Sequence, residues 1–149
     1  MIGSTAKLLG LMYLVPAIAQ QIPGSSATGS TNMACVENLQ IPTYPWLARA
    51  GRVAGTLVVK VKLSADAKVE DVTAEPHLNN NQAQVLLVKP TEDFLRKSQF
   101  SMECGGKIVV LVFDFRISGD PNDPQQQEVA FGYPNRFVIT TRPAPIMAP

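Results

Sequence analysis

The stretch YPWLARAGRVAG at residues 44–55, with TLVVKVKLSADAKVEDV after it at 56–72, decides the fold. Its helical part, WLARAGR, follows Pro45, which suits the first position of a helix because that position needs no N–H donor. Over residues 57–63 every second side chain is apolar, and this period of two predicts a half-buried strand. The polar turn at 64–68 and the weaker run VEDVTAE after it predict an antiparallel hairpin.

The second half of the chain predicts another helix and a long strand. The segment PTEDFLRKS at 90–98 starts with a proline and has acidic residues near its beginning and basic residues near its end, which favours a helix. The longest apolar run, KIVVLVFDFRISG at 107–119, is apolar on one face throughout and on the other face in its first half. The segment EVAFGYPNRFVITTRP at 128–143 predicts a further extended stretch, which Pro134 confines to a sheet edge or a bulge. The fold class expected is α+β, with a small antiparallel sheet of three to four strands and two helices packed on one face.

The first nineteen residues predict an export signal. Lys7 supplies a positive end, residues 8–19 are mostly apolar, and Ala17 and Ala19 flank a cleavage point before Gln20. The alternative is an uncleaved membrane anchor, although about twelve apolar residues interrupted by a proline fall short of the roughly 20 that a spanning helix needs.

Composition divides the chain into four segments. Residues 1–19 are the expected signal peptide, and residues 20–34, rich in Gly, Ser, Thr and Asn, are an expected flexible linker. Residues 35–143 are expected to form one folded domain with a C-terminal extension, because 149 residues have room for one contiguous core. The proline-containing residues 144–149 are an expected disordered tail.

Cys35 and Cys104 are the two cysteines of the chain. In an exported protein they can persist as a disulfide, which would stabilise the fold by roughly 4 kcal/mol. Two separate buried thiols are the alternative, because sequence alone does not show that the Cα atoms come within bridging distance. We expect the disulfide.

The sequence offers few groups for catalysis. His77 is the single histidine and has no evident partner for proton transfer or metal binding. Neighbouring carboxylates, such as those at 70–71 and 92–93, point in different directions on a strand or a helix, and the loop SGDPNDP lacks the acidic spacing of a calcium loop. We therefore expect no enzyme, no cofactor and no metal site. The net charge of +1, with scattered basic residues, also argues against nucleic acid as a partner.

The opening stretch resembles the start of the C-terminal domain of the TonB energy-transducer family. The pattern consists of Tyr44, Pro45, Ala48 and Gly55, followed by a strand, a polar turn and a second strand. The resemblance continues through the second predicted helix and the run at 107–119, so that it covers about residues 40–119. In physical terms, Tyr44 and Trp46 would pack the first helix onto the hairpin, and Gly55 would let the chain turn from helix into strand.

This chain also departs from the family pattern. Ser98 stands where the family has an aromatic residue near the end of its second helix, which leaves Phe100 to fill that part of the core. Ala67 stands where the family usually has a glycine in the hairpin turn. With a cleaved signal, we expect the chain to lack the family's uncleaved anchor and long proline-rich spacer, and it carries an extension at 125–143.

The resemblance implies a role in energy-coupled transport across an outer membrane. In that family the domain adds an extended segment of an outer-membrane receptor beside its third strand, through backbone hydrogen bonds at an open sheet edge. The corresponding edge here spans residues 108–116, and the side chains expected to line it are Ile108, Val110, Val112, Asp114 and Arg116. The implied protein is a periplasmic module whose partner is an outer-membrane receptor or another extended protein segment. An inner-membrane location through an uncleaved N-terminus is the alternative.

A second hypothesis is structural. The extension at 128–141 alternates apolar and polar residues, so it would fold back onto the open edge as a strand of the same chain. The result would be a closed scaffold or a self-associating dimer without transducer activity. A small secreted inhibitor or ligand carrier is a further alternative, because a sheet covered by two helices can leave a cleft.

Overall fold

The structure, a computed structural model, describes residues 33–124, 126–132 and 134–145 and has an α+β fold. The helices are α1 (Trp46–Ala50) and α2 (Val85–Leu95), with two short 3-10 helices, η1 (Met33–Cys35) and η2 (Met102–Cys104). The main sheet contains β2 (Gly55–Leu63), β3 (Val69–Leu78), β5 (Ile108–Ile117), β6 (Glu128–Gly132) and β7 (Arg136–Thr141). A small second sheet pairs β1 (Val36–Asn38) with β4 (Gln99–Phe100). The predicted α+β class with two α-helices is confirmed.

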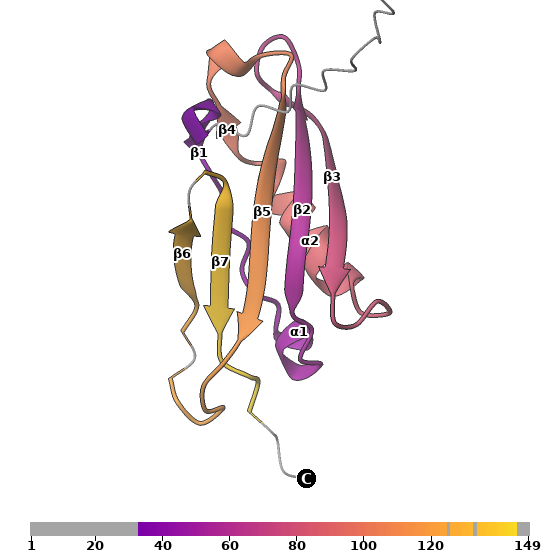
Figure 1. Ribbon diagram of the computed structural model, residues 1–149, viewed down its shortest axis with the longest axis vertical. Coiled ribbons are helices and arrows are strands. Elements are labelled where there is room, and N and C mark those ends of the chain that lie inside the picture. The colour runs from indigo at the N-terminus through magenta and orange to yellow at the C-terminus, as the bar shows by residue number, and fades with distance from the viewer. Residues whose placement is uncertain (1–32, 125, 133, 146–149) are drawn as a thin grey trace, which may run out of the picture.

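The five strands of the main sheet lie in the order β3-β2-β5-β7-β6 (Figure 1). β2 pairs antiparallel with β3 and with β5, and β6 pairs antiparallel with β7. β5 and β7, however, run parallel. The prediction of a purely antiparallel sheet of three to four strands is therefore wrong. The extension forms a hairpin rather than one strand, and the second arm of that hairpin lies against β5.

Burial explains why β7 is the inner arm of this hairpin. Phe137 and Ile139 of β7 are buried on the covered face of the sheet, and the ring of Phe137 stacks on that of Phe113 with 5.5 Å between centroids. Pro134, expected to confine the segment to an edge or a bulge, lies in the connection between the two arms, where it needs no ladder hydrogen bond.

One face of the main sheet is covered. α2 packs against β3 and β2, and the chain between β1 and α1 runs behind the sheet in the view of Figure 1. Tyr44, from that connecting chain, meets Phe115 edge-on with 5.2 Å between ring centroids. The predicted alternation is confirmed, because the fully buried side chains of the sheet are Leu57, Val59, Val61, Leu63, Val109, Leu111, Phe113, Phe115 and Ile139.

α2 begins earlier than predicted. The sequence placed this helix at 90–98 with Pro90 at its first position, whereas Pro90 lies inside the helix. Leu87, Thr91 and Leu95 recur every four residues and are all fully buried. The Thr91 hydroxyl donates a hydrogen bond to the Leu87 carbonyl, 2.7 Å away. Burial of this stripe against the sheet outweighs the helix-breaking tendency of the proline.

The β2–β3 hairpin is longer than predicted. His77, which lies beyond the predicted end of the second strand, belongs to β3, with its side chain exposed and 3.5 Å from a carboxylate oxygen of Glu75. In the turn, Ala67 has a φ of +57°, the left-handed conformation that glycine adopts most easily. At the start of β2, Gly55 has a φ of +133°, and a Cβ atom there would lie 2.4 Å from the His77 carbonyl oxygen. Gly55 therefore lets the chain enter β2 directly beside the end of β3.

The other residues of the opening pattern position α1. Pro45 stands directly before the first helical residue, and Ala48 is the buried residue of this short helix. Tyr44 is buried, and its hydroxyl donates a hydrogen bond to the carbonyl of Val53 beyond the helix. Trp46 is half exposed, so the buried Tyr44 contributes more to the packing expected of this pair. A helix of five residues makes little more than one turn, and the side chain that this turn buries is Ala48.

Tyr44 predicts a pH dependence of stability. Burial raises the pKa of Tyr44 well above its ordinary value. An unfolded tyrosine loses its proton near pH 10, so above about pH 10 the unfolded state binds fewer protons and the free energy of unfolding falls, by up to about 1.4 kcal/mol per pH unit. We expect Tyr44→Phe to remove this contribution. Urea unfolding of both proteins between about pH 8 and 11 measures it, and equal slopes for the two would contradict the assignment.

The predicted disulfide between Cys35 and Cys104 is confirmed, with the Cα atoms 5.6 Å apart. It joins η1 to η2, beside the β1–β4 pairing, where the Ser101 N–H donates to the Cys35 carbonyl at 2.9 Å. Such bonds persist in oxidising compartments. Within the described residues, no helix has the length and apolar character needed to cross a membrane.

Three of the expected segments fall wholly or partly outside the described residues. The signal peptide expected at 1–19 does so entirely, as do residues 20–32 of the expected linker and 146–149 of the expected tail. The linker was expected to run to residue 34, but residues 33–35 form η1. Cys35, the last residue of η1, is bonded to Cys104 of η2, which fixes η1 to the rest of the domain.

Candidate functional site

The five residues expected to line a partner-binding edge all lie on the uncovered face of β5. Ile108 is 44% exposed, and Val110 and Val112 are half-buried. β2 pairs with residues 108–115 of β5 on one side, and β7 pairs with residues 112–117 on the other. On the β7 side, the first residues of β5 have no strand partner among the described residues, although Asn135 Nδ2 donates a hydrogen bond to the Val110 carbonyl at 2.9 Å. The expectation of an open edge at 108–116 is therefore wrong for residues 112–116, where β7 is already paired. The buried side chains of β7 complete the core at the place where an added strand was expected.

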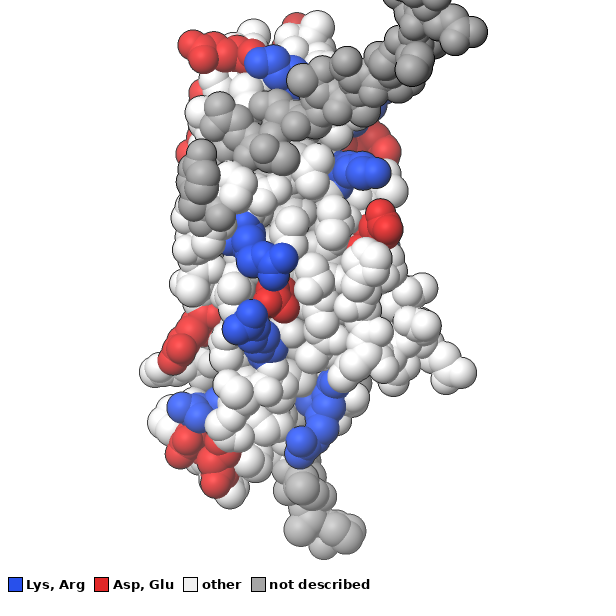
Figure 2. All heavy atoms as spheres, viewed as in Figure 1, with Lys and Arg blue, Asp and Glu red and all other residues white. Residues whose placement is uncertain are grey.

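Asp114 organises the charged part of this uncovered face. Its carboxylate Oδ2 accepts hydrogen bonds from the Arg116 guanidinium at 2.6 and 3.1 Å, and Arg136 Nη1 lies 3.5 Å from the same oxygen. The Asp114 side chain is 12% exposed, whereas those of Arg116 and Arg136 are at least half exposed. Figure 2, viewed from the same side as Figure 1, shows an acidic group flanked by basic groups in the middle of the face. The arrangement neutralises a nearly buried carboxylate and leaves one net positive charge at the surface.

The hydrogen-bond pattern of β7 shows which main-chain groups of β6 face outward. Val112 N–H donates to the Asn135 carbonyl, and Ser118 N–H donates to the Thr141 carbonyl, both at 2.9 Å. Odd-numbered residues of β7 therefore point their main-chain groups at β5, and even-numbered residues point theirs at β6. The even-numbered residues pair with Gly132, Ala130 and Glu128. The N–H and C=O groups of Val129 and Phe131 consequently point away from the sheet.

β6 thus forms an edge with both main-chain and apolar groups available. It is the last strand in the sheet order, and no strand of the described chain pairs with its outer side (Figure 1). The Val129 side chain is 45% exposed and that of Phe131 is 51% exposed. The Phe131 ring also contacts that of Phe137, with 5.2 Å between centroids. A strand added here would find a hydrogen-bonding edge and an apolar surface continuous with the core.

The opposite edge of the sheet, β3, is protected. Ala74 N–H, which points outward, donates to the Glu92 carboxylate of α2 at 3.2 Å. Pro76, two residues later and of the same orientation, has no N–H to offer. Charged side chains of β3, including Asp71 and Glu75, are exposed beside this edge. Proline, charge and a covering side chain are the usual means of preventing strand addition. Within β6 itself no residue is a proline, and the one charged residue is Glu128 at its start.

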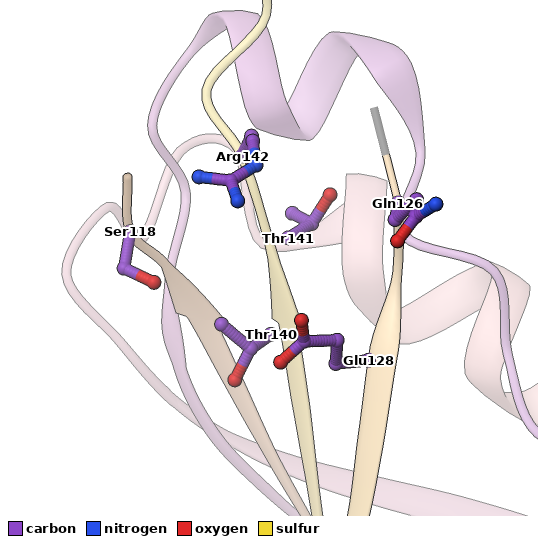
Figure 3. A pocket seen from close by; sticks show the side chains of 6 residues that line it. All are labelled: Ser118, Gln126, Glu128, Thr140, Thr141 and Arg142. Carbon is purple, nitrogen blue, oxygen red and sulfur yellow. The ribbon is translucent and has the colours of Figure 1, made fainter. Parts of the chain in front are cut away.

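A small hollow lies at one end of β6 and β7. It has a volume of about 130 Å³ and is lined by Ser118, Gln126, Glu128, Thr140, Thr141 and Arg142. Figure 3 shows Glu128 and Thr140 close together on neighbouring strands, with Arg142 at the far end of the hollow. Arg142 Nη1 is bound to the Asp123 carboxylate at 2.9 Å. Among the residues that line this hollow, three carry hydroxyls, Glu128 carries a carboxylate and Arg142 a guanidinium.

The remaining titratable groups are dispersed. Within the described residues, no group of three or more histidines, cysteines or carboxylates is placed to hold a metal ion. His77 and Glu75 meet on the exposed face of β3, and Lys89 and Asp93 form an ion pair along α2. Both pairs are typical of solvated surfaces.

The β6 edge is the feature that sequence reasoning missed. Its signal was present in the alternation of Glu128, Val129, Ala130, Phe131 and Gly132, but that alternation was interpreted as part of one strand that closes the sheet. Phe137 and Ile139 close the sheet instead.

Comparisons with protein-family models, with curated proteins and with solved structures give no match for this chain.

Proposed function

We propose that this protein is an exported protein-binding module that accepts an extended segment of another chain along the edge of β6. The observation that carries the proposal is the outward orientation of the main-chain groups of Val129 and Phe131, combined with the exposure of both side chains. Backbone hydrogen bonds would supply affinity, and pockets for alternate side chains would supply specificity. The Cys35–Cys104 disulfide supports an oxidising compartment, for which we propose the periplasm.

The TonB-like assignment belongs to this proposal. The order α1, β2, β3, α2, β5 and the antiparallel arrangement β3-β2-β5 are compatible with it. In the family, the receptor segment joins the third strand, which corresponds to β5. Here β7 occupies that position along residues 112–117, so a role in energy-coupled transport would engage an outer-membrane receptor through β6 instead.

A second candidate is a self-contained structural domain without transducer activity. The observation that favours it is the closure of β5 by the chain's own β7, whose Phe137 and Ile139 are buried. The segment that leads into β6 is bound to the chain before α1, since Gln127 accepts a hydrogen bond from Tyr44 N–H at 2.7 Å and donates one to the Pro42 carbonyl at 3.2 Å. The pairing of β7 with β5 stabilises the folded domain, whereas a partner segment would bind at the open edge of β6.

Strand addition at β6 predicts which two amides respond to a partner. We expect short synthetic peptides, taken from the periplasm-facing segments of outer-membrane receptors, to shift the NMR signals of Val129 and Phe131 and to slow their amide exchange. Val129→Pro should abolish the response, because it removes an outward N–H donor without touching the β6–β7 hydrogen bonds. Val129→Thr, which keeps the N–H and the β-branched shape, is the matched control.

The result would contradict the proposal if peptide-induced shifts mapped to β3 or to the uncovered face of β5. Equal binding by Val129→Pro and Val129→Thr would contradict it as well. A complete lack of binding by every peptide would favour the structural candidate.

A further inference from the structure

We infer that the extended segment which β6 accepts is the β6 strand of a second copy of this chain, in an antiparallel register centred on Ala130. This inference rests on the proposed function, because it names the partner of the same edge. The features that carry it are the pattern of apolar side chains along β6 and the positions of its charges.

Symmetry restricts the register. In an antiparallel pair of strands that continue one sheet, directly opposed residues have their side chains on the same face. The two-fold axis must therefore lie midway between one residue and the same residue of the other copy. A centre at Ala130 is the one that pairs all five residues of β6. It places Val129 opposite Phe131 of the second copy, and Glu128 opposite Gly132 of the second copy. The outward N–H and C=O groups of Val129 and Phe131 then form four hydrogen bonds across the axis.

The covered face of the sheet supplies apolar complementarity. Val129 and Phe131 are both about half exposed, and both lie on the face that carries the core. In this register each Phe131 ring packs beside Val129 of the other copy, so both exposed side chains are covered at once. The aromatic row formed by Phe113, Phe137 and Phe131 then continues across the axis.

The uncovered face supplies charge complementarity. Glu128 of one copy lies opposite Gly132 of the other, and Gly132 is itself paired with Arg136 on β7. Gly132 has no side chain, and even an added Cβ would meet only Arg136 atoms at 3.7 and 3.8 Å. The Glu128 carboxylate therefore has an open path over Gly132 of the other copy to the Arg136 guanidinium of that copy. The Cα atoms of Glu128 and Arg136 would be about 10 Å apart, which is two strand spacings. Two long side chains span that distance.

Arg136 has room for this second contact. It lies 3.5 Å from Asp114 Oδ2, while Arg116 binds that oxygen at 2.6 Å. The Arg136 side chain is 50% exposed. The two-fold axis produces two Glu128–Arg136 pairs and no close contact between like charges. The protected β3 edge offers no comparable pairing.

The test is sedimentation of the full chain over a range of concentrations, with amide exchange measured on the same samples. A short strand pair makes a small interface, so we expect a reversible dimer whose population rises between about 5 and 500 µM. Exchange of the Val129 and Phe131 amides should slow as the dimer forms. Val129→Pro should abolish the dimer, and Val129→Thr should retain it.

Charge reversal tests the register. Glu128→Lys and Arg136→Glu should each raise the dissociation constant by about tenfold or more, because each replaces two attractions with two repulsions. An equimolar mixture of the two variants should recover the wild-type dissociation constant, since the heterodimer contains two opposite-charge pairs. A dimer elsewhere on the surface would show no such recovery. If Arg136→Glu does not fold, the weaker dimer expected for Glu128→Lys and the loss of the dimer expected for Val129→Pro still test the inference.

The possible failures are distinguishable. A chain that stays monomeric while receptor peptides still shift the Val129 and Phe131 amides would overturn the second-copy inference and leave the proposed function intact. A dimer that persists in Val129→Pro would overturn it too. A monomer that binds no peptide would overturn both.

Discussion

Gly55→Ala is expected to destabilise the protein by about 3 kcal/mol or more. Two costs combine at this position. The φ of +133° belongs to a region that residues with a Cβ rarely adopt, and the new Cβ would lie 2.4 Å from the His77 carbonyl oxygen and 2.9 Å from the Leu78 Cα. Both obstacles are main-chain atoms of β3, which is tied to β2 along its length, so neither can move without breaking the hairpin.

Thermal or urea unfolding measures this effect, and a fall in Tm of about 10 °C is expected. Gly51→Ala is the matched control, because Gly51 belongs to the same stretch, ends α1 and has an ordinary φ of −79°. Its nearest obstacle would be the Leu47 carbonyl at 3.3 Å, which requires a shift of a few tenths of an ångström. Equal destabilisation by the two variants would show that the entry into β2 imposes no special requirement at Gly55.

Removal of the disulfide in a Cys35→Ala/Cys104→Ala variant is expected to lower the free energy of unfolding by about 4 kcal/mol. The two cysteines are 69 residues apart in sequence, so the bond restricts a large part of the unfolded chain. Both residues are also buried, at 1% and 5% exposure, so the bond belongs to the packed interior. We expect the β1–β4 pairing to be the first structure lost, because it is short and the disulfide joins the two 3-10 helices, η1 and η2, that adjoin it in sequence.

Urea unfolding of the wild-type chain with and without a reductant, beside the alanine variant, measures this contribution. The reductant should destabilise the wild-type chain and leave the variant unchanged. If the variant does not fold, the loss of stability of the wild-type chain on reduction gives the same quantity. A variant as stable as the oxidised wild type would contradict the expectation.

The parts of the fold that sequence predicted correctly depend on neighbours in the chain. The alternation in β2 and β5, the hairpin after residue 63 and the glycine at 55 are local patterns with one physical solution. The beginning of α2 was predicted wrongly because Pro90 is a strong local signal, whereas Leu87, Thr91 and Leu95 gain their burial from a sheet that the local sequence does not describe. The disulfide was predicted from cellular context rather than from geometry.

The candidate site was harder to predict for a related reason. The residues at 108, 110, 112, 114 and 116 were placed correctly on one face of β5, but whether that strand has a free edge depends on a segment about twenty residues later. The outward orientation of Val129 and Phe131 depends in turn on the direction of β7, which is parallel to β5 against expectation. Side-chain alternation shows which face a residue occupies, but it does not show which side of a strand is left unpaired.

The position of β7 also has a consequence for the order of folding. β7 is the last strand of the described residues but lies between two others in space, so a ribosome releases residues 136–141 after both β5 and β6, the strands that they must join. Until then, β5 presents an unpaired flank and Phe113 lacks its stacking ring. Pairing between strands far apart in sequence slows folding and leaves aggregation-prone intermediates. An incompletely synthesised chain would therefore expose the apolar flank of β5 until its final strand is in place.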